Sequence, residues 1–229
     1  MAEEKKISTE EKLEAFEQTL TKTEMYIEEN RNSLMVIVLA IVLIFGGYYA
    51  YEGLYLKPKA VEAQNAMYAA EIEFKNDAFE VALNGNSENG TAGFIEIIEE
   101  FGSTPAGNLA NYYAGLSYLR MGEFEEALTY LSDYSTESEI LAPMVKGAMG
   151  DANAELGNNE DALNLYIEAS KLSNNEFTAP LFIMKAGNLC EAMGNKDAAI
   201  AHYENLKNNH KNSTEGKQAE KFLARLGKF

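Results

Sequence analysis

The amino-acid sequence predicts an all-α protein in which an N-terminal transmembrane helix precedes a solenoid of helical hairpins and a C-terminal capping helix. Three observations predict this fold class. An uncharged apolar run spans residues 34–51, and a pattern of glycine and alanine recurs three times after residue 108. No segment alternates between polar and apolar residues for long enough to indicate a strand. The apolar run therefore predicts contact with lipid, and the recurring pattern predicts how the rest of the chain folds.

Residues 1–33 form an acidic tail with 5 basic and 9 acidic side chains. Ser8 and Glu11 have the spacing of a capping box, which favours the start of a helix. Apolar residues then recur at helical spacing. We expect a short amphipathic helix that either lies on a surface or docks a cytoplasmic partner. Its apolar positions are Leu13, Phe16, Leu20 and Ile27.

Residues 34–51 form 18 consecutive positions without a charge or an amide. A helix of this length is roughly 27 Å long, close to the ~30 Å hydrocarbon core of a bilayer. Tyr48, Tyr49 and Tyr51 lie at its end, as aromatic side chains do at the boundary with lipid headgroups. The alternative is a buried core helix. The acidic tail argues against a cleaved signal peptide, so we predict a retained transmembrane signal anchor.

Charge leaves the orientation of this predicted span open. Lys22 and Arg31 precede the span, and Lys57 and Lys59 follow it. The positive-inside rule counts lysine and arginine near the two ends, so it favours neither orientation.

Composition excludes several classes of function. The 229 residues contain 19 Lys and Arg against 36 Asp and Glu, a net charge of −17. Nucleic acid is therefore an unsuitable partner, because phosphate binding needs a cationic surface. The single Cys190 excludes an internal disulfide and multi-cysteine metal sites, and His202 and His210 lack the spacing of a metal motif. We expect no catalytic, cofactor-binding or metal-binding residues, and hence no enzyme.

Four prolines mark expected helix starts after the span. Proline is favoured at the first helical position because its missing N–H would be unpaired there. Residues 59–83 keep a helical period, 84–93 have the composition of a loop, and 94–101 form a second helix. We therefore expect a helical pair over 58–105. The prolines are Pro58, Pro105, Pro143 and Pro180.

The recurring pattern predicts helical hairpins. A first glycine is followed after seven residues by a second, then after five by alanine, then after four by a bulky residue. The small residues let two antiparallel helices approach, and the second glycine permits a left-handed turn between them. Such hairpins must stack to bury their apolar faces. The sets are Gly115, Gly122, Ala127 and Leu131; Gly150, Gly157, Ala162 and Tyr166; Gly187, Gly194, Ala199 and Tyr203.

This pattern resembles a tetratricopeptide repeat (TPR) array, most closely in the first repeat. Asn153 and Cys190 depart from it, because they stand where the first repeat has Tyr118. The resemblance implies a TPR-like domain over 58–229, in which the helical pair over 58–105 is a degenerate repeat (the degenerate pair). Its repeats are expected over 108–141, 142–178 and 179–212, and its capping helix over 214–228.

The layout of tail, span and repeats is similar to a bacterial family of single-span TPR proteins that accompany the Sec translocon. The resemblance implies anchoring in the inner membrane with the C-terminal domain in the periplasm. It also implies protein partners: translocon subunits, periplasmic chaperones or secretory clients. Two alternatives stay open: a self-associating scaffold for envelope assembly or division, and a cytoplasm-facing membrane adaptor. A homo-oligomer is compatible with each.

The resemblance further implies that the first helix of each repeat lines a partner-binding groove. A carboxylate clamp is not expected, because Tyr112, Gly147 and Met184 replace its first lysine and only Arg120 is basic. An apolar strip that contains methionine remains, which suits adaptable contact with a hydrophobic segment. The alternative is that these residues form the core between repeats. The candidates are Leu109, Tyr112, Leu116, Leu119, Arg120, Met144, Asp151, Leu181, Met184 and Asn188.

Overall fold

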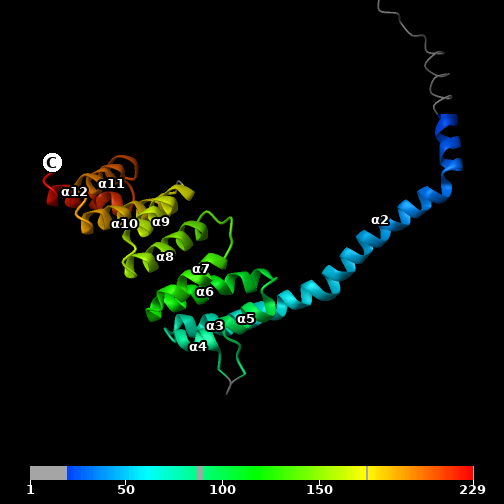
Figure 1. Ribbon diagram of the computed structural model, residues 1–229, viewed down its shortest axis with the longest axis horizontal. Coiled ribbons are helices and arrows are strands. Elements are labelled where there is room, and N and C mark those ends of the chain that lie inside the picture. The colour runs from blue at the N-terminus through cyan, green and yellow to red at the C-terminus, as the bar shows by residue number, and fades with distance from the viewer. Residues whose placement is uncertain (1–19, 87–89, 174, 229) are drawn as a thin grey trace, which may run out of the picture. The chain divides into compact units, whose positions relative to one another are not determined.

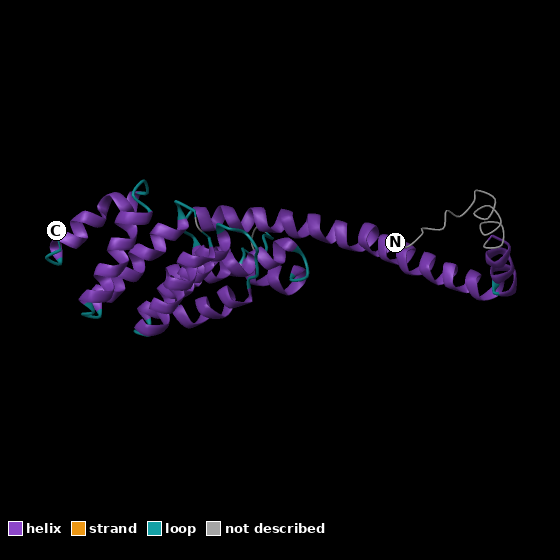
Figure 2. Cartoon of the chain, turned by 90° about the horizontal axis from the view of Figure 1, so that it is seen from above, coloured by secondary structure: helices purple, strands orange, loops and turns teal. Residues whose placement is uncertain are grey.

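The computed structural model describes residues 20–86, 90–173 and 175–228. Within these residues every regular element is a helix, apart from an isolated bridge between Asn86 and Thr91 (Figure 2). The predicted all-α class is confirmed. The chain divides into two compact units, one up to Pro58 and one from Lys59 onward.

The first unit contains the predicted span. Residues 20–29 are helical, and α2 follows over Arg31–Tyr51 (Figure 1). No residue of α2 is buried, which disfavours the alternative of a core helix. The helical segment is long and apolar enough to cross a membrane by length and composition. Ser8, Glu11, Leu13 and Phe16 of the predicted amphipathic helix lie outside the described residues.

A π-helical turn, η1, covers Glu52–Leu56 and leads directly into α3, Lys57–Lys75. The sequence predicts a helix start at Pro58. The structure differs, because the helical chain runs through Pro58 without a break. The Lys57 N–H donates to the Glu52 carbonyl, five residues back, instead of to the usual carbonyl four residues back. A wider turn of this kind gives the proline ring room where it would clash in a regular helix.

The degenerate pair contains three helices instead of the expected two. α3 ends at Lys75, α4 covers Phe79–Asn84 and α5 covers Phe94–Phe101. The helix expected over 59–83 is interrupted at Asp77, which adopts a left-handed conformation with φ 59°. Aspartate tolerates this conformation better than most residues, and the Ala78 N–H bonds the Glu73 carbonyl at 3.0 Å.

Three helical hairpins and a final helix complete the second unit. The first helices of the hairpins, α6, α8 and α10, contact one another in succession, and α10 also contacts α12. Each hairpin packs its second helix on its first. The bounds are α6 Pro105–Met121, α7 Phe124–Asp133, α8 Leu141–Glu155, α9 Asn159–Leu172, α10 Thr178–Ala192, α11 Lys196–Asn209 and α12 Thr214–Arg225 (Figure 1).

The glycines of the repeat act as the pattern predicts. The turn glycines Gly122, Gly157 and Gly194 have φ of 85°, 80° and 78°. The next residue then bonds a carbonyl five residues back, as in a Schellman motif. At the first glycine positions the bulky residue covers the bare backbone. A Cβ would lie 2.6 Å from an atom of that residue in each pair: Gly115 with Leu131, Gly150 with Tyr166 and Gly187 with Tyr203.

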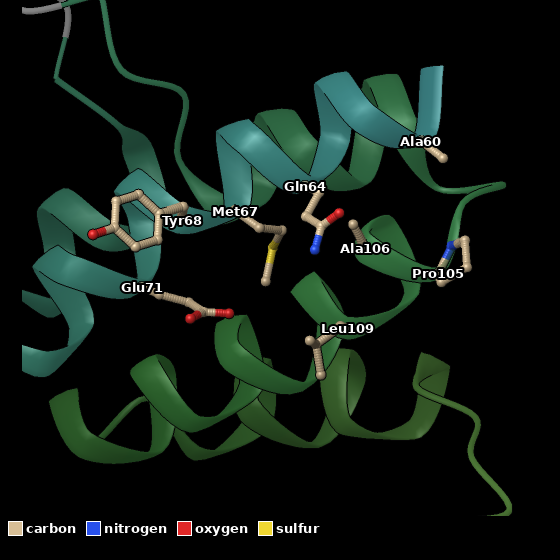
Figure 3. Close-up of a pocket in the computed structure, with 8 residues that line it drawn as sticks. All are labelled: Ala60, Gln64, Met67, Tyr68, Glu71, Pro105, Ala106 and Leu109. Atoms are coloured by element: carbon tan, nitrogen blue, oxygen red, sulfur yellow. The ribbon is translucent and has the colours of Figure 1, made fainter. Parts of the chain in front are cut away.

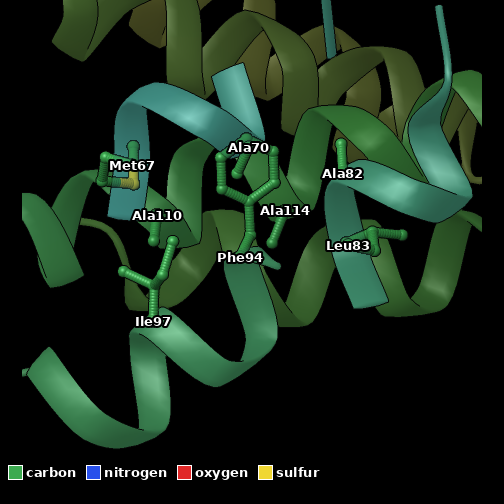
Figure 4. Close-up of a cluster of buried hydrophobic side chains, with 8 residues drawn as sticks. All are labelled: Met67, Ala70, Ala82, Leu83, Phe94, Ile97, Ala110 and Ala114. Carbon is green, nitrogen blue, oxygen red and sulfur yellow. The ribbon is translucent and has the colours of Figure 1, made fainter. Parts of the chain in front are cut away.

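The core of the second unit is a series of apolar clusters along the hairpins. The first cluster joins α3, α4, α5 and α6 around Phe94, which is fully buried (Figure 4). Its ring stacks on Tyr113 with centroids 5.3 Å apart. The degenerate pair is therefore packed onto the first repeat by aromatic contacts. The eight buried members are Met67, Ala70, Ala82, Leu83, Phe94, Ile97, Ala110 and Ala114.

Candidate functional site

The ten predicted groove residues lie on the first helices of the three hairpins, α6, α8 and α10. Their apolar members mostly pack between hairpins. Tyr112, Leu116 and Leu119 contact the cluster of Leu131, Val145 and Ala148, and Met144 and Leu181 pack against the next cluster. Met184 is only 8% exposed and belongs to the cluster around Tyr203. The apolar strip expected from the sequence is thus largely engaged in packing, with Met184 buried in the cluster of α10, α11 and α12 and the other apolar members partly buried.

The polar candidates Asp151, which is half-buried, and Asn188, which is exposed, accept hydrogen bonds from tyrosines of their own hairpins. Asp151 accepts from the Tyr166 hydroxyl at 2.7 Å and from Lys185 Nζ at 2.5 and 2.7 Å. Asn188 Oδ1 accepts from the Tyr203 hydroxyl at 2.8 Å. These side chains position neighbouring helices, because Asp151 and Lys185 belong to consecutive hairpins.

The same device recurs one repeat later. Glu191 Oε2 lies 3.1 Å from the Tyr203 hydroxyl and 2.6 Å from a nitrogen of Arg225 on α12. In both cases one carboxylate accepts hydrogen bonds from a tyrosine and from a basic side chain. The basic residue follows the carboxylate by 34 residues in each case. Sequence reasoning missed Lys185 and Arg225. Their equal spacing from Asp151 and Glu191 is the signal that could have identified them.

Arg120, the single basic candidate, turns toward the degenerate pair. Its guanidinium lies 3.5 Å from Asp77 and 5.4 Å from the centroid of the Phe79 ring. Asp77 lies between α3 and α4, and Phe79 is the first residue of α4. Both members of the ion pair are largely exposed, so it contributes little to holding α6 against the degenerate pair.

An open pocket of about 420 Å³ lies between α3 and α6 (Figure 3). Met67, Gln64 and Glu71 reach toward it from α3, and Leu109 and Ala106 border it from α6. Leu109 is the one groove candidate that lines it. The α3 residues were missed because this pair lacks the glycine register by which groove positions were assigned. The lining residues are Ala60, Gln64, Met67, Tyr68, Glu71, Pro105, Ala106 and Leu109.

Two neighbouring tyrosines of α6 have raised pKa values. Burial raises the pKa of Tyr113 above its usual value, and the nearby Glu71 carboxylate adds to the effect. Burial likewise raises the pKa of Tyr112, with smaller contributions from Tyr113 and Tyr134. The pocket itself is lined by apolar side chains together with the Glu71 carboxylate, the Gln64 amide and Tyr68.

Groups with catalytic potential are engaged in packing. Cys190 is buried at 1% exposure, and burial raises the pKa of its thiol, which disfavours the reactive thiolate. Burial lowers the pKa of His202. Within the described residues no cluster of three or more His, Cys, Asp and Glu side chains could hold a metal ion.

Tyr203→Phe is expected to reduce the loss of stability at alkaline pH. Burial, reinforced by the Glu191 carboxylate, raises the pKa of Tyr203 from 10.0 to about 12. Ionisation is thus easier in the unfolded chain, so this stabilisation is complete below pH 10 and lost as pH rises toward 12. Urea unfolding at several pH values measures the effect, with the exposed Tyr68→Phe as control. A wild type and Tyr203→Phe that lose stability in parallel above pH 10 would contradict the prediction.

Comparison with protein families supports the repeat assignment. A tetratricopeptide repeat model matches residues 109–137 and 183–213, which cover much of the first and third hairpins. No match was found among curated proteins. Repeats of this kind indicate a protein–protein interaction module. The chain therefore contains tetratricopeptide repeats that stack as an all-helical array.

Proposed function

We propose that this chain is a non-enzymatic, membrane-anchored protein-interaction module of the bacterial cell envelope. In this proposal α2 spans the inner membrane once and the repeat unit lies in the periplasm. The apolar composition of α2, none of whose residues is buried, supports the anchor. The tetratricopeptide repeats support binding of protein partners.

The proposed partners are Sec translocon subunits, periplasmic chaperones or secretory clients, and the proposed role is to assist the handling of secreted proteins. The layout of tail, apolar helix and repeats supports this assignment by resemblance. The observation that supports the location of the proposed binding surface is the open pocket between α3 and α6. Most other groove candidates are packed against the apolar clusters.

A photo-crosslinking residue at Gln64 tests the proposed function, because this side chain lines the pocket. The same residue at Gln218, which is exposed on α12, is the matched control. Crosslinks from Gln64 to translocon subunits, chaperones or secretory proteins, absent from Gln218, are the expected result. Equal capture from both positions, or none, would reject this surface as the binding site.

The orientation has its own test. A reporter active only outside the cytoplasm, fused after Phe229, is expected to be active, and a cytoplasmic reporter at the same position inactive. The opposite pattern would reject the periplasmic proposal and leave a cytoplasm-facing adaptor.

A further inference from the structure

The surface beside the pocket on α3 is more apolar than an ordinary exposed helix face. Val61, Tyr68 and Ile72 are 59%, 67% and 39% exposed. They are separated by seven and four residues, so they share one side of the helix. Tyr68 also lines the pocket, which makes the stripe and the pocket one continuous surface. Gln64 and Asn65 lie exposed in the turn between Val61 and Tyr68, so the face is amphipathic. Exposed apolar side chains gathered on one side of a helix are typical of interaction sites.

This surface has the dimensions of a docked helix. The stripe from Val61 to Ile72 covers twelve residues of α3, about 16 Å from end to end at the helical rise. The neighbouring pocket of about 420 Å³ is bordered by Met67 of α3 and Leu109 of α6, and its volume is sufficient for one large side chain. An amphipathic helix that lies along a groove with one anchor inserted is a common recognition mode.

The charges around the pocket indicate which kind of partner helix would bind there. Glu71 is the one charged residue that lines the pocket, and its carboxylate lies near the position of an inserted anchor (Figure 3). Lys75 approaches it at 3.7 Å, but this lysine is largely exposed, so the pair contributes little. The surrounding helices are acidic: the described residues from 59 to 101 contain Glu62, Glu71, Glu73, Asp77, Glu80, Glu96, Glu99 and Glu100 against Lys59 and Lys75.

We infer that the surface formed by the pocket and the α3 stripe binds an amphipathic helix that carries a large apolar anchor and, one turn away, a lysine or arginine. The anchor occupies the pocket between Met67 and Leu109, and the cation pairs with Glu71. The acidic surroundings favour approach of a basic segment and disfavour an acidic one. This inference rests on the proposed function, because it names the partner chemistry of the same pocket.

Two fluorescent peptides of about 14 residues, or about four helical turns, test the inference. They share a leucine stripe and differ only in lysine or glutamate four residues after the central leucine. Binding to the full chain in zwitterionic nanodiscs is followed by anisotropy, with empty nanodiscs as blank. The lysine peptide is expected to bind at least about tenfold more tightly. Equal binding of the two peptides, tighter binding of the glutamate peptide, or binding of neither would overturn the inference.

Variants assign the effect to Glu71. Glu71→Gln is expected to reduce the preference for the lysine peptide to the weak part that the surrounding acidic residues supply, and Glu71→Lys to reduce it further. Glu99→Lys, an equal charge change at an exposed position of α5, is expected to retain it. An unchanged preference in Glu71→Gln would contradict the assignment. Loss of the inferred preference with Gln64 crosslinks intact would leave the proposed function standing, so the two failures are distinguishable.

A homodimer dissociated by Tyr68→Ala would identify a second copy as occupant and also overturn the inference.

Discussion

Phe94→Ala is expected to destabilise the repeat unit by about 3–5 kcal/mol, the usual cost of removing a fully buried phenylalanine. Phe94 is 0% exposed and joins α3, α5 and α6 in one cluster. Its ring stacks on Tyr113 and meets the edge of Phe74, so the substitution removes aromatic contacts as well as apolar area. Urea unfolding of the full chain in nanodiscs, followed by circular dichroism, measures the loss.

Phe177→Ala is the matched control, because Phe177 is 65% exposed at the start of α10. Its effect is expected to stay within about 0.5 kcal/mol. Phe94→Ala should also weaken peptide binding at the pocket, since the cluster positions α3 against α6. If the two variants were equally stable, Phe94 would not hold the degenerate pair onto the first repeat.

The hairpins could be predicted from sequence because their determinants are local and repeated. A glycine that must adopt a positive φ, such as Gly122, cannot be exchanged freely, and a glycine under a bulky side chain, such as Gly115, shows the same restriction. The interruption at Asp77 carries no comparable signal. Apolar residues on both sides keep a helical period, so the break depends on tertiary packing of α4 onto α6.

The candidate site was less predictable than the fold. Groove positions were assigned by register, which fixes the face of a helix but not what occupies the space beside it. Met184 and Leu181 lie on the assigned face, yet Met184 is buried in a cluster of α10, α11 and α12, and Leu181 is partly buried against α9 and α10. The pocket lies instead where α3 meets α6 and no repeat register exists. Its position depends on the irregular packing of the degenerate pair, which no local pattern encodes.

Polar contacts explain how consecutive hairpins keep one arrangement. Asp151 joins Tyr166 of its own hairpin to Lys185 of the next, and Glu191 joins Tyr203 to Arg225. An apolar interface alone tolerates sliding, whereas a carboxylate shared by two donors has a narrow range of geometries. The array therefore combines non-directional burial with directional contacts at successive interfaces, which keeps the first helices aligned.

Gly147→Ala is expected to destabilise the chain by roughly 1–3 kcal/mol, although helix propensity alone favours alanine over glycine by about 1 kcal/mol. Gly147 lies in the middle of α8, and a Cβ there would overlap the ring of Phe182 from the next hairpin. Phe182 is 2% exposed, so its contact with the bare glycine backbone is part of the core. Phe182→Ala should itself cost about 3–5 kcal/mol.

The double variant separates packing from propensity. In the Phe182→Ala background the ring is absent, so Gly147→Ala is expected to become stabilising by up to about 1 kcal/mol. The same substitution thus changes sign, with a coupling energy of about 2 kcal/mol from the double-mutant cycle. Urea midpoints of the four proteins measure it. A Gly147→Ala variant that stabilises the chain with Phe182 present would show that the ring does not rest on Gly147, and with it that this contact does not fix the spacing of the second and third hairpins.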